Sequence, residues 1–191
     1  MKLVIVFLVA GLSYCTAKAD NVINVDQIGS NNGVAITQEG NGHTATVTTG
    51  KTSDVDYTTI SITQQGAAKT ANVEIKSGIN NNVIIQQDGT GNHNAGIQNL
   101  NGSGNNISIS QSGTGNHTFN VINGTGTTNN GNTVNATQSG GAGADKSFNL
   151  TFGGATSANA TVIQTGTTTD TGSMNIQCPT GSCGSYSYIR Y

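Results

Sequence analysis

The motif Gln-x-Gly recurs along this chain at a nearly constant interval. From the second copy onward the spacings are 26, 23, 24, 27 and 26 residues. A period in this range is typical of stacked repeats, in which no single unit can bury its apolar face alone. The recurrence therefore predicts a solenoid. The seven glutamines are Gln27, Gln38, Gln64, Gln87, Gln111, Gln138 and Gln164.

The residues before each glutamine indicate that the repeating unit is a β-strand. In N-N-I-S-I-S-Q-S-G, residues 105–113, apolar residues alternate with small polar ones. Alternate residues of a strand point to opposite faces of its sheet. We therefore expect Asn105, Ile107, Ile109 and Gln111 to share the inward face.

The composition suits a narrow solenoid better than an ordinary globule. Only 34% of the residues are hydrophobic and 8% are charged, while 27 are glycine. A globular core needs more apolar area, and a disordered chain usually carries more net charge and more proline. The segments between the expected strands are rich in Gly, Asn, Thr and Ser, which favour turns.

We predict an all-β fold, a two-sheet β-solenoid of about six strand-turn-strand rungs with amyloid-like (cross-β) stacking. An N-terminal half-rung at residues 21–29 precedes the rungs. Stacked strands would pair in parallel about 4.8 Å apart, with the two sheets about 10 Å apart. The expected core residues are Ile23, Val25, Ile60, Ile62, Val83, Ile85, Ile107, Ile109, Phe119, Val121, Val134 and Val162.

Side-chain amides repeated in register would stack as ladders along the solenoid axis, and such ladders add to cross-β stability. We expect one ladder of the seven glutamines. A second would hold the asparagines that begin strands, Asn82, Asn105 and Asn132.

The N-terminus reads as a signal peptide over residues 1–19. Lys2 precedes an apolar run at residues 3–12 that is too short to span a bilayer, and Ala-x-Ala at 17–19 predicts cleavage before Asp20. We expect an exported chain without a membrane span. Removing Lys2 and Lys18 from the seven basic residues leaves five against nine acidic ones, a net charge of −4. This balance argues against binding of nucleic acid.

The expected mature chain divides into repeats at residues 20–178 and a C-terminal cap or tail at 179–191. Cys178 and Cys183 remain after cleavage, and their spacing in an oxidising compartment predicts a local disulfide rather than a metal site. The tail departs from the repeat and holds three of the five tyrosines and the sole arginine, Arg190.

The repeat resembles the curlin repeat of bacterial curli fibres, whose pattern is roughly Gln-x-Gly-x2-Asn-x-Ala-x-(Val/Ile)-x-Gln. Residues 87–98 match it most fully, with one extra residue in the turn, and residues 111–116 reproduce the turn. The resemblance covers about residues 21–176. The turns at 51–56, 124–131 and 141–146 are longer than the uniform arcs of that family.

The resemblance implies a secreted structural subunit that polymerises head to tail into extracellular functional amyloid fibres for biofilm matrix, adhesion and surface colonisation. Its implied partners are copies of itself, other curlin subunits, and accessory proteins of export and nucleation. Unpaired sheet edges template the addition of strands, which supports such growth. The alternative, motivated by the divergent tail, is a minor subunit that nucleates or anchors the fibre of another curlin.

Other classes of function have weaker support. No Ser/His/Asp set, carboxylate pair or Cys–His dyad stands out, so we predict neither an enzyme nor a cofactor. We interpret His43, His93 and His117 as turn residues at solvated corners, with a metal-binding or pH-sensitive ladder as the alternative. Residues 140–146 suggest a calcium-binding solenoid and residues 44–48 an ice-binding one. The former has no tandem copy, and the threonines of the latter do not line up between rungs.

Overall fold

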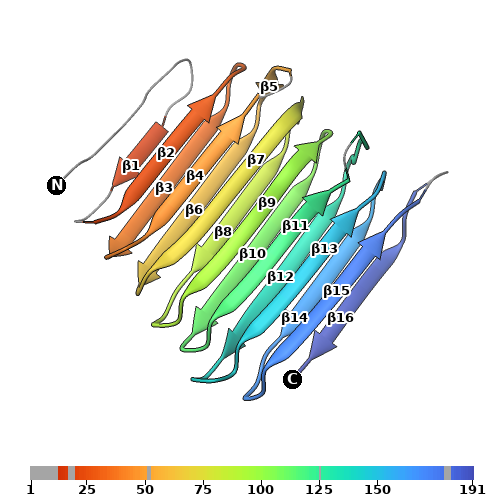
Figure 1. Cartoon of the computed structure of the whole chain (residues 1–191). Coiled ribbons are helices and arrows are strands. Elements are labelled where there is room, and N and C mark those ends of the chain that lie inside the picture. Colours follow the sequence, from red (N-terminus) through yellow and green to blue (C-terminus); the bar gives the residue numbers. More distant parts are fainter. Residues whose placement is uncertain (1–12, 17–19, 51–52, 125, 179–181) are drawn as a thin grey trace.

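The chain folds into two β-sheets that face each other and extend along one axis (Figure 1). The computed structural model describes residues 13–16, 20–50, 53–124, 126–178 and 182–191, and within these ranges every regular element is a strand. Sheet A contains, in spatial order, β1 (Ser13–Thr16), β3 (Gly33–Gly40), β6 (Thr59–Gly66), β8 (Asn82–Gln87), β10 (Asn106–Gly113), β12 (Thr133–Gly140), β14 (Asn159–Gln164) and β16 (Ser185–Arg190). Sheet B contains β2 (Val22–Gln27), β4 (Thr44–Thr49), β7 (Lys69–Ile79), β9 (His93–Asn101), β11 (His117–Asn123), β13 (Lys146–Phe152) and β15 (Asp170–Ile176).

The predicted two-sheet solenoid is confirmed. After β2, which forms the N-terminal half-rung, the chain alternates between the sheets and makes six rungs from β3–β4 to β14–β15 within the described residues. Neighbouring strands of each sheet pair in parallel, and their repeats are in register, with Gln111 between Gln87 and Gln138. A short strand, β5 (Val55–Asp56), pairs with the end of β7 at one corner.

Alternation of apolar and polar residues produces the buried interior. Ile107 and Ile109 of β10 are each 1% exposed, while Ser108 between them faces outward. The other apolar positions expected to be inward are also buried, except Val25, which is only partly buried. Val25 belongs to β2, the first strand of sheet B, and therefore has a neighbouring strand on one side only.

Glycine after each ladder glutamine lets the corners of successive rungs stack closely. Gly66 has φ +89°, and a Cβ there would lie 2.2 Å from the carbonyl oxygen of Gly89 on the next rung. A side chain at this position would clash with the backbone of the next rung. The glycine of Gln-x-Gly is therefore required for the rungs to stack.

The C-terminal tail is part of the solenoid rather than an addition to it. Strand β16 pairs in parallel with β14 from Asn159–Ser185 to Gln164–Arg190. A disulfide joins Cys178 to Cys183, with their Cα atoms 5.7 Å apart, in the connection between β15 and β16. The sequence did not predict this strand, because the tail lacks both Gln-x-Gly and an aliphatic alternation.

At the other end of sheet A, β1 pairs in parallel with β3, from Ser13–Val34 to Thr16–Thr37. This strand falls within the segment expected to be a signal peptide. Among the described residues from Asp20 onward, each sheet holds seven strands. No helix in the described part of the chain is long and apolar enough to cross a membrane.

Candidate assembly interface

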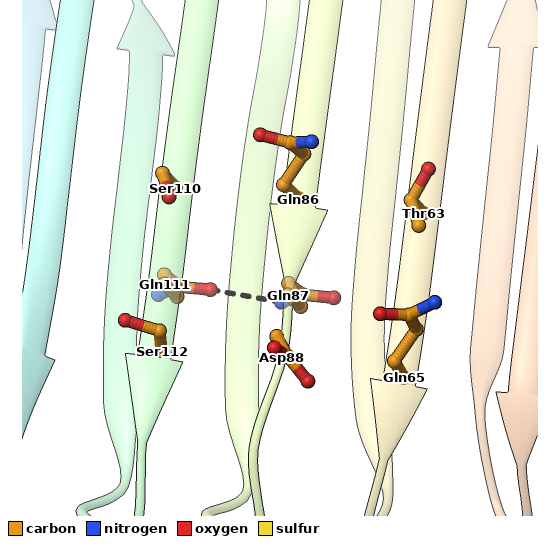
Figure 2. A pocket seen from close by; sticks show the side chains of 8 residues that line it. All are labelled: Thr63, Gln65, Gln86, Gln87, Asp88, Ser110, Gln111 and Ser112. Atoms are coloured by element: carbon orange, nitrogen blue, oxygen red, sulfur yellow. Dashed lines mark hydrogen bonds between the residues drawn. The ribbon is translucent and has the colours of Figure 1, made fainter.

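Six glutamines form one continuous hydrogen-bonded ladder inside sheet A. The Nε2 atom of Gln38 donates to Oε1 of Gln64 at 2.8 Å, and each following glutamine donates in the same direction, up to Gln138 to Gln164 at 2.7 Å. Figure 2 shows the central bond, from Gln87 to Gln111, at 2.8 Å. The ladder therefore has a polarity, with donors directed toward the C-terminal end of the stack.

The same amides also connect the two sheets. Nε2 of Gln64 donates to the carbonyl of Thr44 at 3.1 Å, and Nε2 of Gln87 donates to the carbonyl of Thr70 at 3.0 Å. Both N–H groups of such a glutamine are used, one along the axis and one across the interior. Since a buried amide is costly unless hydrogen-bonded, this arrangement keeps glutamine tolerable among aliphatic neighbours.

The two ends of the ladder differ. At its C-terminal end, Nε2 of Gln164 donates to the carboxylate Oδ2 of Asp170 at 2.8 Å. At its N-terminal end, Gln38 is 3% exposed, and its Oε1 has no hydrogen-bond partner among the described residues. The ladder thus ends in a satisfied donor on one side and an unsatisfied acceptor on the other.

Gln27 was predicted to join this ladder, and that prediction is wrong. Gln27 lies on β2 in sheet B, beside Thr49, and its buried Nε2 has no partner among the described residues. The first Gln-x-Gly belongs to the half-rung and so to the opposite sheet. The spacing of 11 residues to Gln38, about half a period, is the sequence signal for this placement.

The asparagine ladder contains Asn81 rather than the predicted Asn82. Asn81 is 1% exposed and in line with Asn105, whereas Asn82 is half-buried and pairs with Asn106 on the outer side of the sheet. The correct residue stands six positions before its ladder glutamine, as Asn105 does before Gln111. In a run of three asparagines, counting back from Gln87 distinguishes it.

These asparagines join backbone to backbone between rungs. Oδ1 of Asn81 accepts from the backbone N–H of Asn105 at 3.1 Å, and Oδ1 of Asn105 accepts from that of Asn132 at 3.1 Å. Nδ2 of Asn105 donates to the carbonyl of Asn129 at 2.8 Å. At the first full rung, Asn32 accepts in the same way from the N–H of Thr58. Each amide therefore fixes the register of the next rung.

The three histidines are buried, which corrects the interpretation as solvated corners. His43, His93 and His117 are at most 2% exposed. Nε2 of each lies within hydrogen-bond distance of the backbone carbonyl of the residue that follows a ladder glutamine. The rings of His93 and His117 stack with centroids 4.8 Å apart. The ordinary exposure of Gly/Asn turns misled the interpretation, because these turns press against their neighbours along the axis.

Two lysines occupy the same buried column. Register places Lys69 beside His93 and Lys146 beside His117. The Lys69 ammonium donates to the carbonyls of Ala67, Gly89 and Gly91 at 2.7 to 2.9 Å. A ring of carbonyl dipoles thus replaces water around this charge.

Burial determines the protonation of the column. It lowers the pKa of His93 to about 4 and also lowers the pKa values of His43, His117 and Lys69. The histidines are therefore neutral at neutral pH. In the described residues no three His, Cys, Asp or Glu side chains gather in a way that could hold a metal ion.

The outer face of sheet A is mostly polar, with Ile84 and Ile189 among its exposed apolar residues. Figure 2 shows the side chains that line a hollow over β6, β8 and β10, where each strand presents alternate residues to the outside. The outward residues around it are Thr63, Gln65, Gln86, Asp88, Ser110 and Ser112. A hollow bordered by hydroxyl, amide and carboxylate side chains is a poor pocket for a small organic ligand, because such pockets are lined mainly by apolar and aromatic side chains.

A family comparison explains the repeat. Residues 19–50, which include β2, β3 and β4, match the family model described as Curlin associated repeat. This segment is similar to a curlin repeat. The match confirms the predicted resemblance over residues 19–50, and the curlin repeat is typical of structural proteins. Gln38 and Gly40 of the matched curlin segment pair with Gln64 and Gly66 on the following rung, so the pattern continues beyond it. Neither the curated proteins nor the solved structures gave a match.

Proposed function

We propose that this protein is a secreted structural subunit that polymerises head to tail into extracellular, curli-like amyloid fibres, which serve biofilm matrix, adhesion and surface colonisation. The curlin repeat supports the structural class. The observation that carries the proposal is the complementarity of the two ends of the solenoid.

The chain from Asp20 begins in sheet B with β2 and ends in sheet A with β16, at opposite ends of the stack (Figure 1). At the C-terminal end the edges of β15 and β16 are open, and at the N-terminal end those of β2 and β3 once β1 is removed. A second copy would place β2 on β15 and β3 on β16, which continues the alternation without a missing strand. Repetition of such a contact gives an open filament.

Strand addition at the N-terminal edge has a precedent inside the molecule. The backbone of β1 pairs in parallel with β3 over four residues. The β3 edge therefore accepts a parallel strand on the side where β16 of another copy would lie. An open edge of this kind templates strand addition unless it is blocked.

The nucleator alternative rests on the divergence of the tail. In the fold, β16 continues sheet A and so supports the role of an ordinary subunit that transmits the stack. A dedicated nucleator would stay monomeric when purified and would shorten the lag of another curlin. Export and accessory partners follow from the family resemblance, and the disulfide agrees with an oxidising compartment.

Purified chain 20–191 tests the proposal by electron microscopy and fibre diffraction. Seven strands per sheet, spaced about 4.8 Å along the axis, give an axial repeat of about 34 Å for each subunit. We expect fibres with a meridional reflection at about 4.8 Å. A chain that stays monomeric at high concentration, with or without seeds of its own, would contradict the proposal.

A further inference from the structure

The amide ladder of sheet A is incomplete within one molecule. Every glutamine from Gln64 to Gln164 receives a hydrogen bond at Oε1 from the preceding rung. Gln38 Oε1, at the start, is buried and has no partner among the described residues. A buried acceptor left unpaired costs about as much as a lost hydrogen bond. The position that would supply its donor is one rung before β3.

The opposite end of the molecule carries a donor in the same column. Register places Arg190 next to Gln164, one rung beyond the last glutamine. Arg190 also has the parity of Tyr186 and Tyr188. Tyr188 contacts inward groups: its ring is tilted by 57° against that of Phe148, with the centroids 4.9 Å apart, and its hydroxyl donates to Asp170. Arg190 therefore occupies the ladder position of β16, as the sole arginine of the chain.

An arginine suits this position chemically. Its guanidinium has five N–H donors and no acceptor. The guanidinium cannot accept a hydrogen bond from Gln164, and none is needed, because Nε2 of Gln164 already donates to the carboxylate of Asp170. Its pKa is raised by the Tyr188 hydroxyl and by nearby Asp170, so it stays charged. One of its donors is hydrogen-bonded to the Tyr188 hydroxyl. A guanidinium has four others, and Arg190 is exposed in the isolated molecule, so these can point toward a following copy.

We propose that Arg190 of one copy donates to Oε1 of Gln38 in the next copy, and that this contact sets the register of the joint between subunits. The inference rests on the proposed head-to-tail growth and deepens it. In the same register Val34 lies beside Tyr186 and Ile36 beside Tyr188, so apolar residues meet aromatic ones along the joint. The partner is a second copy of this chain.

Among the residues that the structure describes, no contact fills the site. The pairing of β1 with β3 ends at Thr16–Thr37, one residue before Gln38. In the joint, by contrast, the pairing would extend through Arg190. One ladder would then run through both copies, and every glutamine acceptor in it would have a donor.

Seeded elongation of chain 20–191 tests the inference. Arg190→Met removes the donors at similar length, Arg190→Gln restores a donor and continues the amide ladder, and Ser187→Ala changes an exposed residue on the outer face of the same strand. With variant seeds and variant monomer, we expect Arg190→Met to elongate at least tenfold more slowly than wild type. Arg190→Gln and Ser187→Ala should stay within about twofold of it. Monomer unfolding curves, expected to be the same for all four chains, check that each is folded.

Gln38→Glu gives a second test, because its elongation rate should depend on residue 190 only if the two side chains meet in the joint and not if Arg190 merely supports folding. The carboxylate keeps an acceptor for Arg190, and the charged pair is favourable across the joint. Gln38→Glu also loses the Nε2 donor to Oε1 of Gln64, which slows elongation relative to wild type in either background. It should still elongate clearly faster with Arg190 than with Arg190→Met, where the carboxylate has no cation in the joint. Equal rates for wild type and Arg190→Met, or no dependence of Gln38→Glu on residue 190, would overturn the inference. Failure of the wild type to form fibres would instead refute the proposed function.

Discussion

The imidazole rings of His93 and His117 are stacked in the buried column of sheet B, with centroids 4.8 Å apart and an angle of 1° between the ring planes. The rise from one rung to the next sets their separation, since both occupy the same position of successive rungs. Lys69 and Lys146 flank the pair in register. The two rings cannot both be protonated without placing like charges in contact, and the flanking lysines disfavour even one proton.

The column predicts that stability falls as the pH is lowered. The folded-state pKa of His93 is about 4, below its ordinary value of 6.5, so the unfolded chain binds protons more readily than the folded one. The contribution of the neutral ring is present above pH 6.5 and is lost between about 6.5 and 4. His43 and His117 shift in the same direction. We expect a lower urea midpoint for the monomer at pH 5 than at pH 7.5.

A matched variant assigns this effect. In His93→Gln with His117→Gln, the difference between the midpoints at the two pH values should shrink. Asp88 and Asp145, which lie near the column, are present in both wild type and variant, so any effect of their titration is the same in the two proteins. A wild-type midpoint that is equal or higher at pH 5 would contradict the prediction.

The amide ladder predicts a large contrast between two adjacent glutamines. Gln87 is 1% exposed, accepts from Gln64 and donates to Gln111, whereas its neighbour Gln86 points outward and is exposed. Gln87→Leu leaves at least one buried polar group unpaired and should lower the free energy of unfolding by about 2 to 3 kcal/mol. Gln86→Leu should change it by less than about 0.5 kcal/mol. Equal effects in urea titrations would argue against the ladder as a source of stability.

Strand β1 predicts that the N-terminal segment controls growth. Its pairing with β3 covers the edge that would receive β16 of another copy. A chain from Met1 should therefore add to seeds at one end only, and more slowly than a chain from Asp20. Microscopy of labelled monomer on preformed seeds separates the two ends. Growth at the same rate and at the same ends for both chains would show that β1 does not block the edge.

Much of this fold is readable from the sequence because stacking repeats a local pattern. The alternation around Ile107 and Ile109 and the spacing of the glutamines identify strands, inward faces and period. Placement of Gln27 and Asn82 failed because each depends on which sheet or register a strand takes, a property of neighbours rather than of the local pattern. The sheet of Gln27 follows from its spacing of half a period from Gln38. The choice of Asn81 over Asn82 follows from the number of residues between Asn81 and Gln87.

Burial of the corner histidines and the continuation of sheet A by β16 were not predictable from local composition. A turn rich in Gly and Asn usually faces solvent, but here the next rung covers it, and carbonyl groups meet His93 and Lys69. The tail lacks the repeat motif, yet Tyr186 and Tyr188 fill inward positions above Ala160 and Val162. Only the stacked neighbour reveals either fact.

The joint between copies is tested most directly by cysteine cross-linking. In the proposed register Ala35 of one copy lies beside Ser187 of the next, and both residues face outward. Neighbouring strands at about 4.8 Å bring Cα atoms within the range of a disulfide. Fibres of chain 20–191 with Ala35→Cys and Ser187→Cys should give, after mild oxidation, a ladder of covalent multimers on a non-reducing gel, while Ala35→Cys with Ser185→Cys should give almost none. Fibres that form but show no multimers, or equal multimers from both pairs, would contradict the head-to-tail joint.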